Sequence, residues 1–330
     1  MKRVMKFLAA AAILSVATPA AADPMLSGFD YGFPLPRHAL VSQGVAMEMV
    51  YIDQRPRKAN GRTVVLLHGK NFCAGSWDAT IRALTAAGYR VIALDQVGFC
   101  KSTKPARYQY GLHTLAANTK GLLDALNVER PIVMGHSMGG MLAMRYAIQY
   151  PEALSGLVLV NPIGLEDWRA LGVPNATVDA LYEGERKTTA ESIRAYQRST
   201  YYAGTWRPEW DRWVTMLASM YEGEAGHITA WHQALTSDMI FNQPVIHELE
   251  RITAPTLMLS GDRDTTAVGK NRASAELAAR LGNYASLAPA AMARIRGGRL
   301  IRYADLGHSP HVQDPERFHR DLLAGLAGLR

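Results

Sequence analysis

Residues 131–150 have the sequence PIVMGHSMGGMLAMRYAIQY. An apolar run leads through the motif GHSMG at 135–139 into an amphipathic stretch, and this order predicts a nucleophile elbow between a strand and a helix. Glycine suits positions 135 and 139 because side chains there would collide with the neighbouring strand and helix. Such a turn exposes a side chain above a helix N-terminus, where free N–H groups favour negative charge. We therefore expect Ser137 to be a nucleophile.

Apolar runs alternate with amphipathic stretches along most of the chain, as in a parallel sheet buried on both faces. The expected strands are Thr63–Leu67, Tyr89–Leu94, Pro131–Met134, Leu154–Val160, Pro255–Ser260 and Arg299–Tyr303. The expected helices are Ser76–Ala87, Leu112–Leu126, Met138–Tyr150 and Pro315–Leu326. With an antiparallel edge hairpin over Ala39–Tyr51, the pattern predicts a doubly wound, mostly parallel eight-stranded α/β sheet.

The alternation stops between residues 164 and 249. We expect 23–163 and 250–330 to form the sheet core and 164–249 to form a helical cap over its carboxyl edge. The cap holds five of the six tryptophans, Trp168, Trp206, Trp210, Trp213 and Trp231. One or two of them, with Trp168 as a candidate, are expected to line a partly apolar substrate pocket. The alternative is that the tryptophans fill the core of the cap.

A serine at neutral pH needs a base to act as a nucleophile. His308 follows the last apolar run, at the same sheet edge as the elbow, and is the predicted base, with His311 as the alternative. His136 lies too close to Ser137 in sequence and is assigned a packing role. His68 is expected to brace its loop through backbone hydrogen bonds.

The base in turn needs an acid that holds its tautomer and stabilises the imidazolium. Asp264 ends the apolar run that precedes the last one and is the predicted partner. Asp262 is the nearest alternative, and Glu166-Asp167 after an earlier run is a weaker one. The order Ser137, Asp264, His308 places each residue just after an apolar run.

A tetrahedral intermediate needs two N–H donors. The backbone of Met138, directly after the nucleophile, is one expected donor. The backbone of Lys70, in the loop after Thr63–Leu67, is the other. The side chains of Lys70 and Asn71 are unusual at this place; they point either at a substrate carboxylate or carbonyl, or into solvent. Asn71 and Phe72 are candidate substrate contacts.

The first 22 residues have the pattern of a secretory signal: a basic start, a short apolar run and the small residues Ala20 to Ala22. Cleavage after Ala22 would lower the net charge from +7 to +4. The alternative is an uncleaved N-terminal anchor. We expect a periplasmic or secreted protein without stable membrane anchoring. No cluster of basic and aromatic residues points to nucleic acid, and no metal-binding motif is present.

The sequence resembles the α/β-hydrolase superfamily, in the branch of serine esterases, haloperoxidase-like enzymes and carbon–carbon bond hydrolases. The matching motifs are His68-Gly69, Asp95–Ser102, Gly135–Gly140, Gly261–Asp264 and Gly307-His308. The match covers roughly 61–162 and 250–325 and leaves the cap outside. The resemblance implies acyl transfer by a Ser–His–Asp triad on the matched residues, without a cofactor.

Two cysteines depart from the pattern of this family. Cys100 occupies a position where the family has glycine, and Cys73 lies in the loop that supplies an oxyanion donor. In this fold the strands before the two loops are neighbours, so the resemblance implies that the cysteines can meet in a disulfide. The alternative is two small buried thiols.

The sequence therefore predicts a serine hydrolase that cleaves an ester or similar activated acyl bond of a small to medium molecule. The alternatives are a carbon–carbon bond or lactone hydrolase on the same triad, and a non-catalytic binding protein of this fold. A serine at position 137 argues against dehalogenase and epoxide hydrolase chemistry, where an aspartate stands.

Overall fold

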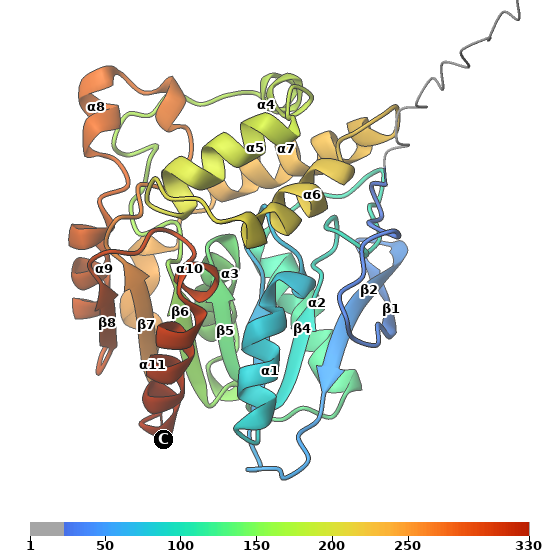
Figure 1. Ribbon diagram of the computed structural model, residues 1–330, viewed down its shortest axis with the longest axis vertical. Coiled ribbons are helices and arrows are strands. Elements are labelled where there is room, and N and C mark those ends of the chain that lie inside the picture. The colour runs from blue at the N-terminus through green and yellow to red at the C-terminus, as the bar shows by residue number, and fades with distance from the viewer. Residues whose placement is uncertain (1–22, 330) are drawn as a thin grey trace, which may run out of the picture.

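Eight strands form one sheet in the computed structural model, which describes residues 23–329 (Figure 1). The strands are β1 (Arg37–Ser42), β2 (Val45–Gln54), β3 (Thr63–Leu67), β4 (Arg90–Leu94), β5 (Ile132–His136), β6 (Gly156–Val160), β7 (Thr256–Gly261) and β8 (Arg299–Tyr303). Their order in the sheet is β1-β2-β4-β3-β5-β6-β7-β8. The hairpin β1–β2 is antiparallel and joins β4 antiparallel, whereas all the later pairs are parallel.

The central strands are apolar runs because helices cover both faces of the sheet. Every residue of β5, β6 and β7 is buried. Their register aligns the carboxyl ends, since Leu67 pairs with Gly135, His136 with Val160, and Gly261 with Tyr303. The residues that follow these strands therefore meet at one edge of the sheet.

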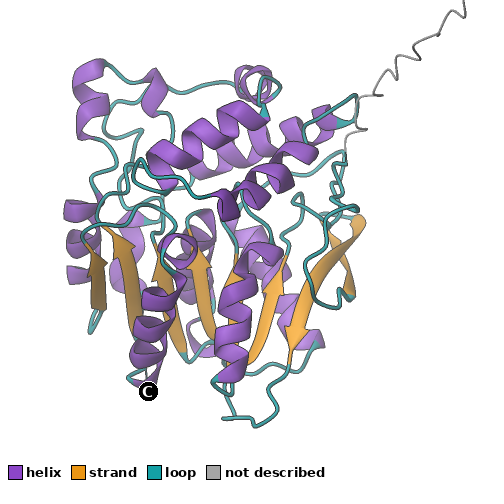
Figure 2. Cartoon of the chain, in the orientation of Figure 1, coloured by secondary structure: helices purple, strands orange, loops and turns teal. Residues whose placement is uncertain are grey.

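Helices pack on the two faces of the sheet (Figure 2). One face carries α1 (Asp78–Ala86) and α11 (Pro315–Ala327), which contact each other, and the other carries α2 (Leu112–Ala125) and α3 (Met138–Gln149). The predicted helices and parallel strands agree with these elements to within about two residues, and the edge hairpin extends three residues beyond its predicted end, to Gln54. The sequence between β7 and β8 also holds α8 (Ala275–Arg280) and α9 (Tyr284–Ala293), for which no helix was predicted.

Residues 164–249 contain helices and no strand, and these helices lie across the carboxyl edge of the sheet (Figure 1). The four α-helices are α4 (Val178–Glu185), α5 (Ala190–Tyr196), α6 (Asp211–Ser219) and α7 (Gly226–Asn242). A π-helical turn, Gln197–Tyr201, continues α5. We call this segment the cap.

The proposed secretory signal, residues 1–22, lies outside the described residues. Within 23–329, no helix combines the length and apolar character that a bilayer span requires.

Candidate active site

Ser137 occupies a strained turn between β5 and α3, with φ of 55° and ψ of −121°. Glycine is required on both sides of it. A Cβ at Gly135 would lie 2.0 Å from the carbonyl oxygen of Gly139, and a Cβ at Gly139 would lie 2.1 Å from that of Leu67. Both distances are far below any real contact, so only glycine allows α3 to start this close to the sheet. The motif therefore forms the predicted elbow.

His308 and Asp264 form a fully buried pair at the same sheet edge. Nδ1 of His308 lies 2.6 Å from Oδ2 of Asp264, and neither side chain has exposed surface. The carboxylate also accepts hydrogen bonds from Asn161 Nδ2 at 2.9 Å and from the Thr266 N–H at 2.8 Å. Three donors thus hold the Asp264 carboxylate where it can orient the imidazole and stabilise its charged form.

The alternatives to this pair have other partners. Asp262 forms an ion pair with Arg302. Glu166 accepts hydrogen bonds from Trp168 Nε1 and from a backbone N–H.

His311 stacks on Trp77 with ring centroids 4.5 Å apart, and burial lowers its pKa to about 3. The geometry therefore favours His308 over His311 as the base.

A hydrogen bond joins the elbow to the loop that carries His308. Nε2 of His136, the residue before Ser137, donates to the carbonyl oxygen of His308 at 3.0 Å. Burial holds the pKa of His136 well below its ordinary value, so its imidazole is neutral. Within residues 23–329, Nε2 of His308 is buried without a hydrogen-bond partner, and Ser137 is 6% exposed. Catalytic hydrogen bonds often form only when substrate is bound.

The loop after β3, residues 68–73, lies against the nucleophile and is called the β3 loop below. A Cβ at Gly69 would lie 3.0 Å from Cβ of Ser137. His68 braces this loop, because Nε2 accepts the N–H of Gln96 at 3.1 Å and Nδ1 lies 2.9 Å from the Gly69 carbonyl oxygen. Lys70 directly follows Gly69. Met138 is the first residue of α3, where a backbone N–H has no helical partner.

Side chains of the cap bind the β3 loop through an ion pair and two hydrogen bonds. Lys70 Nζ forms an ion pair with Glu185 of α4 at 2.7 Å, and the Lys70 side chain is only 17% exposed. Asn71 Nδ2 donates to the Tyr201 hydroxyl at 3.0 Å. Gln233 Nε2 donates to the Lys70 carbonyl oxygen at 3.2 Å.

The two aromatic residues that were predicted to contact substrate, Phe72 and Trp168, are buried in the core. Phe72 is 2% exposed and stacks on Tyr201, with centroids 5.5 Å apart. Trp168 is 2% exposed and donates to Glu166. Trp206 and Trp210 pack on Tyr202.

Two pockets beside the β3 loop, of about 280 and 710 Å³, are lined by Lys70, Asn71 and Tyr196, and no tryptophan lines either one. Tyrosine and polar side chains form much of the walls of these two pockets. Trp210 and Trp213 instead line a separate pocket of about 180 Å³, which His311 also lines.

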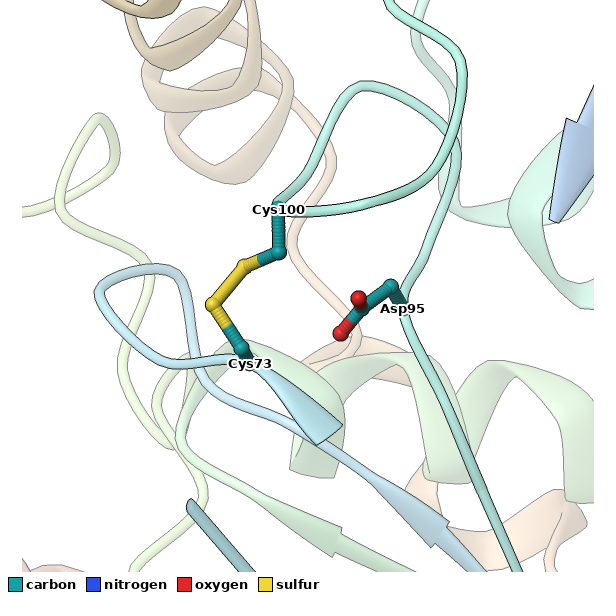
Figure 3. Close-up of side chains that lie close together, drawn as sticks. All are labelled: Cys73, Asp95 and Cys100. Carbon is teal, nitrogen blue, oxygen red and sulfur yellow. A yellow bond between two sulfur atoms is a disulfide. The ribbon is translucent and has the colours of Figure 1, made fainter. Parts of the chain in front are cut away.

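A disulfide joins Cys73 of the β3 loop to Cys100, and Figure 3 places the Asp95 carboxylate beside it. The Cα atoms of the two cysteines lie 5.9 Å apart. The two oxygens of Asp95 accept the N–H groups of Ala74 at 2.7 Å and of Lys101 at 3.1 Å. The disulfide and Asp95 therefore fix the β3 loop to its neighbour. Both sulfurs are bonded to each other, so this group of side chains offers no thiolate to a metal ion.

Two site residues escaped the sequence analysis. Asn161 directly follows β6, and this position at the carboxyl edge was the available signal. Tyr201 lies in the π-helical turn, with its ring centroid 4.9 Å from that of His308. Its carbonyl oxygen accepts the N–H of Ser309 at 3.3 Å. No sequence motif marks Tyr201.

Comparisons with known proteins identify the fold. A family model described as the alpha/beta hydrolase fold matches residues 62–315 and confirms the expected fold class. A crystal structure of a "probable hydrolytic enzyme" from Pseudomonas aeruginosa PAO1 is 58% identical, has a TM-score of 0.92, and the alignment covers 93% of this chain and 99% of that one.

Curated relatives have hydrolase names. A protein of Pantoea ananatis with the name "Putative carbamate hydrolase RutD" is 27% identical over 83% of this chain and 92% of its own length. The 2-hydroxy-6-oxo-6-phenylhexa-2,4-dienoate hydrolase of Comamonas testosteroni is 36% identical over 41% of this chain and 48% of its own.

Proposed function

The chain belongs to the α/β-hydrolase family of enzymes, and on that premise we propose that it is a serine hydrolase of an ester or similar activated acyl bond. The observation that carries the proposal is the fully buried pair of His308 and Asp264. This pair lies at the sheet edge where Ser137 stands on its elbow. A small to medium substrate fits the pockets beside the β3 loop.

In the proposed reaction, Nε2 of His308 accepts the proton of Ser137 Oγ while this oxygen attacks the carbonyl carbon. Asp264 holds Nδ1–H of His308 and stabilises the imidazolium. The backbone N–H groups of Met138 and Lys70 stabilise the oxyanion. His308 then gives the proton to the leaving alcohol, and an acyl group remains on Ser137. Water activated by His308 hydrolyses this acyl-enzyme and releases the acid.

A fluorophosphonate probe together with a series of p-nitrophenyl esters tests the proposal. The wild type is expected to bind the probe covalently and to release p-nitrophenol, and Ser137→Ala is expected to do neither. Labelling that persists in Ser137→Ala, or a wild type that neither reacts with the probe nor cleaves any ester, contradicts the proposal.

A carbon–carbon bond hydrolase is the second candidate. Relatives with that activity in their names match about 40% of the chain at 36 to 38% identity. Ser137, Asp264 and His308 can serve that reaction as well. The two activities are therefore distinguished by which substrate the protein cleaves. Loss of the absorbance of 2-hydroxy-6-oxo-6-phenylhexa-2,4-dienoate, dependent on Ser137, supports this candidate; an unchanged spectrum excludes it for this compound.

We also propose that the protein acts outside the cytoplasm, as a periplasmic or secreted enzyme. The disulfide between Cys73 and Cys100 supports this, since structural disulfides persist in oxidising compartments. The signal-like pattern of residues 1–22 supports it as well. N-terminal sequencing of protein recovered from the periplasm or the medium is expected to give Asp23 as the first residue. A retained Met1 contradicts it.

A further inference from the structure

The smaller pocket beside the β3 loop has a mainly polar wall. Its volume is about 280 Å³, and it lies between Lys70 and Asn71 of the loop and residues of the cap. Among its lining residues, only Ile193 and Leu217 are aliphatic. A wall of this kind does not suit a plain hydrocarbon chain, because the polar groups would lose water without gaining a partner.

The side chain of Gln197 lines this pocket, and its amide has no partner. Gln197 is 1% exposed, and within residues 23–329 neither Oε1 nor Nε2 forms a hydrogen bond. Buried side-chain amides are nearly always hydrogen-bonded, so an amide with both ends unpaired requires an explanation. A ligand that offers one acceptor and one donor side by side would satisfy both atoms.

We propose that this pocket is a subsite for a secondary amide group of the substrate. Nε2 of Gln197 donates to the amide oxygen of the ligand, and Oε1 accepts its N–H. The substrate class is then an ester whose acyl part carries an amide, such as an N-acyl amino acid ester. This inference rests on the proposed ester hydrolysis and specifies its substrate.

The charges in the pocket favour a neutral ligand group. Lys70 Nζ and Glu185 Oε1 are 2.7 Å apart, and their side chains are only 17% and 19% exposed. The Tyr221 hydroxyl donates to Glu185 Oε2, also at 2.7 Å. Because the ammonium and the carboxylate neutralise each other, neither is free to bind a charged ligand. An amide is polar and uncharged, and it fits this environment.

Two parts of the pocket wall are joined through the chain to residues that lie against Ser137 and His308. Lys70 and Asn71 directly follow Gly69, which lies against Ser137. Gln197 starts the π-helical turn that ends at Tyr201, whose ring lies against His308. An amide bound to Gln197 is therefore expected within a few bonds of the carbonyl carbon that Ser137 attacks.

Three p-nitrophenyl esters of equal chain length test the inference. The N-acetylglycine ester carries the amide, the 4-oxopentanoate ester keeps the carbonyl and lacks the N–H, and the pentanoate ester lacks both. Each kcat/KM is divided by the rate constant for hydroxide hydrolysis of the same ester, which removes intrinsic reactivity. The wild type is expected to prefer the N-acetylglycine ester over the pentanoate by about tenfold or more, with the 4-oxopentanoate in between.

Gln197→Met keeps the size of the side chain and removes the amide. It is expected to abolish this preference, so that the normalised rates of the N-acetylglycine and pentanoate esters become about equal. Gln149→Met is the matched control, because Oε1 of Gln149 is also unpaired but the residue lies at the far end of α3. The control is expected to keep the preference. Equal normalised rates in the wild type, or an unchanged preference in Gln197→Met, overturn the inference. If Gln197→Met does not fold, the comparison of esters in the wild type decides.

Binding separates this inference from the proposed function. N-acetylglycine methyl ester is titrated into Ser137→Ala and into Ser137→Ala with Gln197→Met, and heat is measured by calorimetry. About tenfold weaker binding in the second protein supports the subsite even if no ester is cleaved by the wild type. Equal binding, or none, overturns the subsite and leaves the hydrolase proposal to the fluorophosphonate experiment.

Discussion

Oδ2 of Asp264 lies 2.6 Å from Nδ1 of His308 in a place that no solvent reaches. The same oxygen accepts a hydrogen bond from Asn161, and the other oxygen accepts one from the Thr266 backbone. These donors hold the carboxylate beside Nδ1, and a carboxylate at this place fixes which nitrogen of His308 carries the proton. In the proposed reaction, Nε2 is thereby left free to accept the proton of Ser137.

Asp264→Asn is expected to lower kcat by about 10⁴-fold, because an amide at this position favours the wrong tautomer of His308. Steady-state kinetics on a p-nitrophenyl ester measure the effect. Asp262→Asn is the control, since Asp262 pairs with Arg302 and not with the base. A large loss of kcat in the Asp262 variant and none in the Asp264 variant would show that the acid is misassigned.

Replacing both Cys73 and Cys100 by serine is expected to lower the free energy of unfolding by about 3–4 kcal/mol, given a sequence separation of 27. We also expect kcat to fall by about 10-fold or more, because the β3 loop and its Lys70 N–H are less firmly placed. Urea denaturation and ester kinetics check both effects. Dithiothreitol should reproduce them in the wild type and leave the double variant unchanged. Two free thiols in the unfolded, unreduced wild type contradict the prediction.

Acidification below pH 6.5 is expected to destabilise the protein. Burial lowers the pKa of His311 to about 3 and the pKa values of His232 and His319 to about 4. Between these values and 6.5 the unfolded chain binds protons that the folded chain excludes. The free energy of unfolding therefore decreases as the pH is lowered, by up to about 1.4 kcal/mol per pH unit for each histidine.

Urea titrations between pH 6.5 and 5 measure this slope, in a range above most carboxylate titrations. His311→Phe keeps an aromatic ring beside Trp77 and removes one titrating group. Its slope is expected to be shallower than that of the wild type by about 1 kcal/mol per unit. An unaltered slope in His311→Phe would mean that His311 does not contribute to the pH dependence of the free energy of unfolding.

Gly139→Ala is expected to destabilise the protein by about 3 kcal/mol or more, since its Cβ would meet the backbone oxygen of Leu67 at 2.1 Å. Gly121→Ala is the matched control in α2, where a Cβ meets nothing within 4 Å. This control should raise stability by about 0.5–1 kcal/mol, because alanine suits a helix better than glycine. Thermal unfolding of both variants measures the difference. Equal melting temperatures contradict a tight elbow.

Local patterns predicted the sheet, because a strand buried on both faces must be apolar and a helix on its face must be amphipathic. The run Arg299–Tyr303 agrees with β8 at both ends. Ser137, Asp264 and His308 were found because each follows such a run, and parallel strands bring their carboxyl ends to one edge. The helices α8 and α9 lay outside the pattern, and α9 has little amphipathic character.

The sequence by itself therefore determined the sheet, the elbow and the three residues at its edge, since periodicity and chain order are local properties. The tertiary structure alone decided what surrounds them. Lys70 pairs with Glu185, 115 positions away, and Gln197 faces a pocket rather than a partner. These contacts depend on how the cap helices pack over the sheet. Contacts between residues so far apart in the sequence produce no periodic pattern of apolar residues from which they could be predicted.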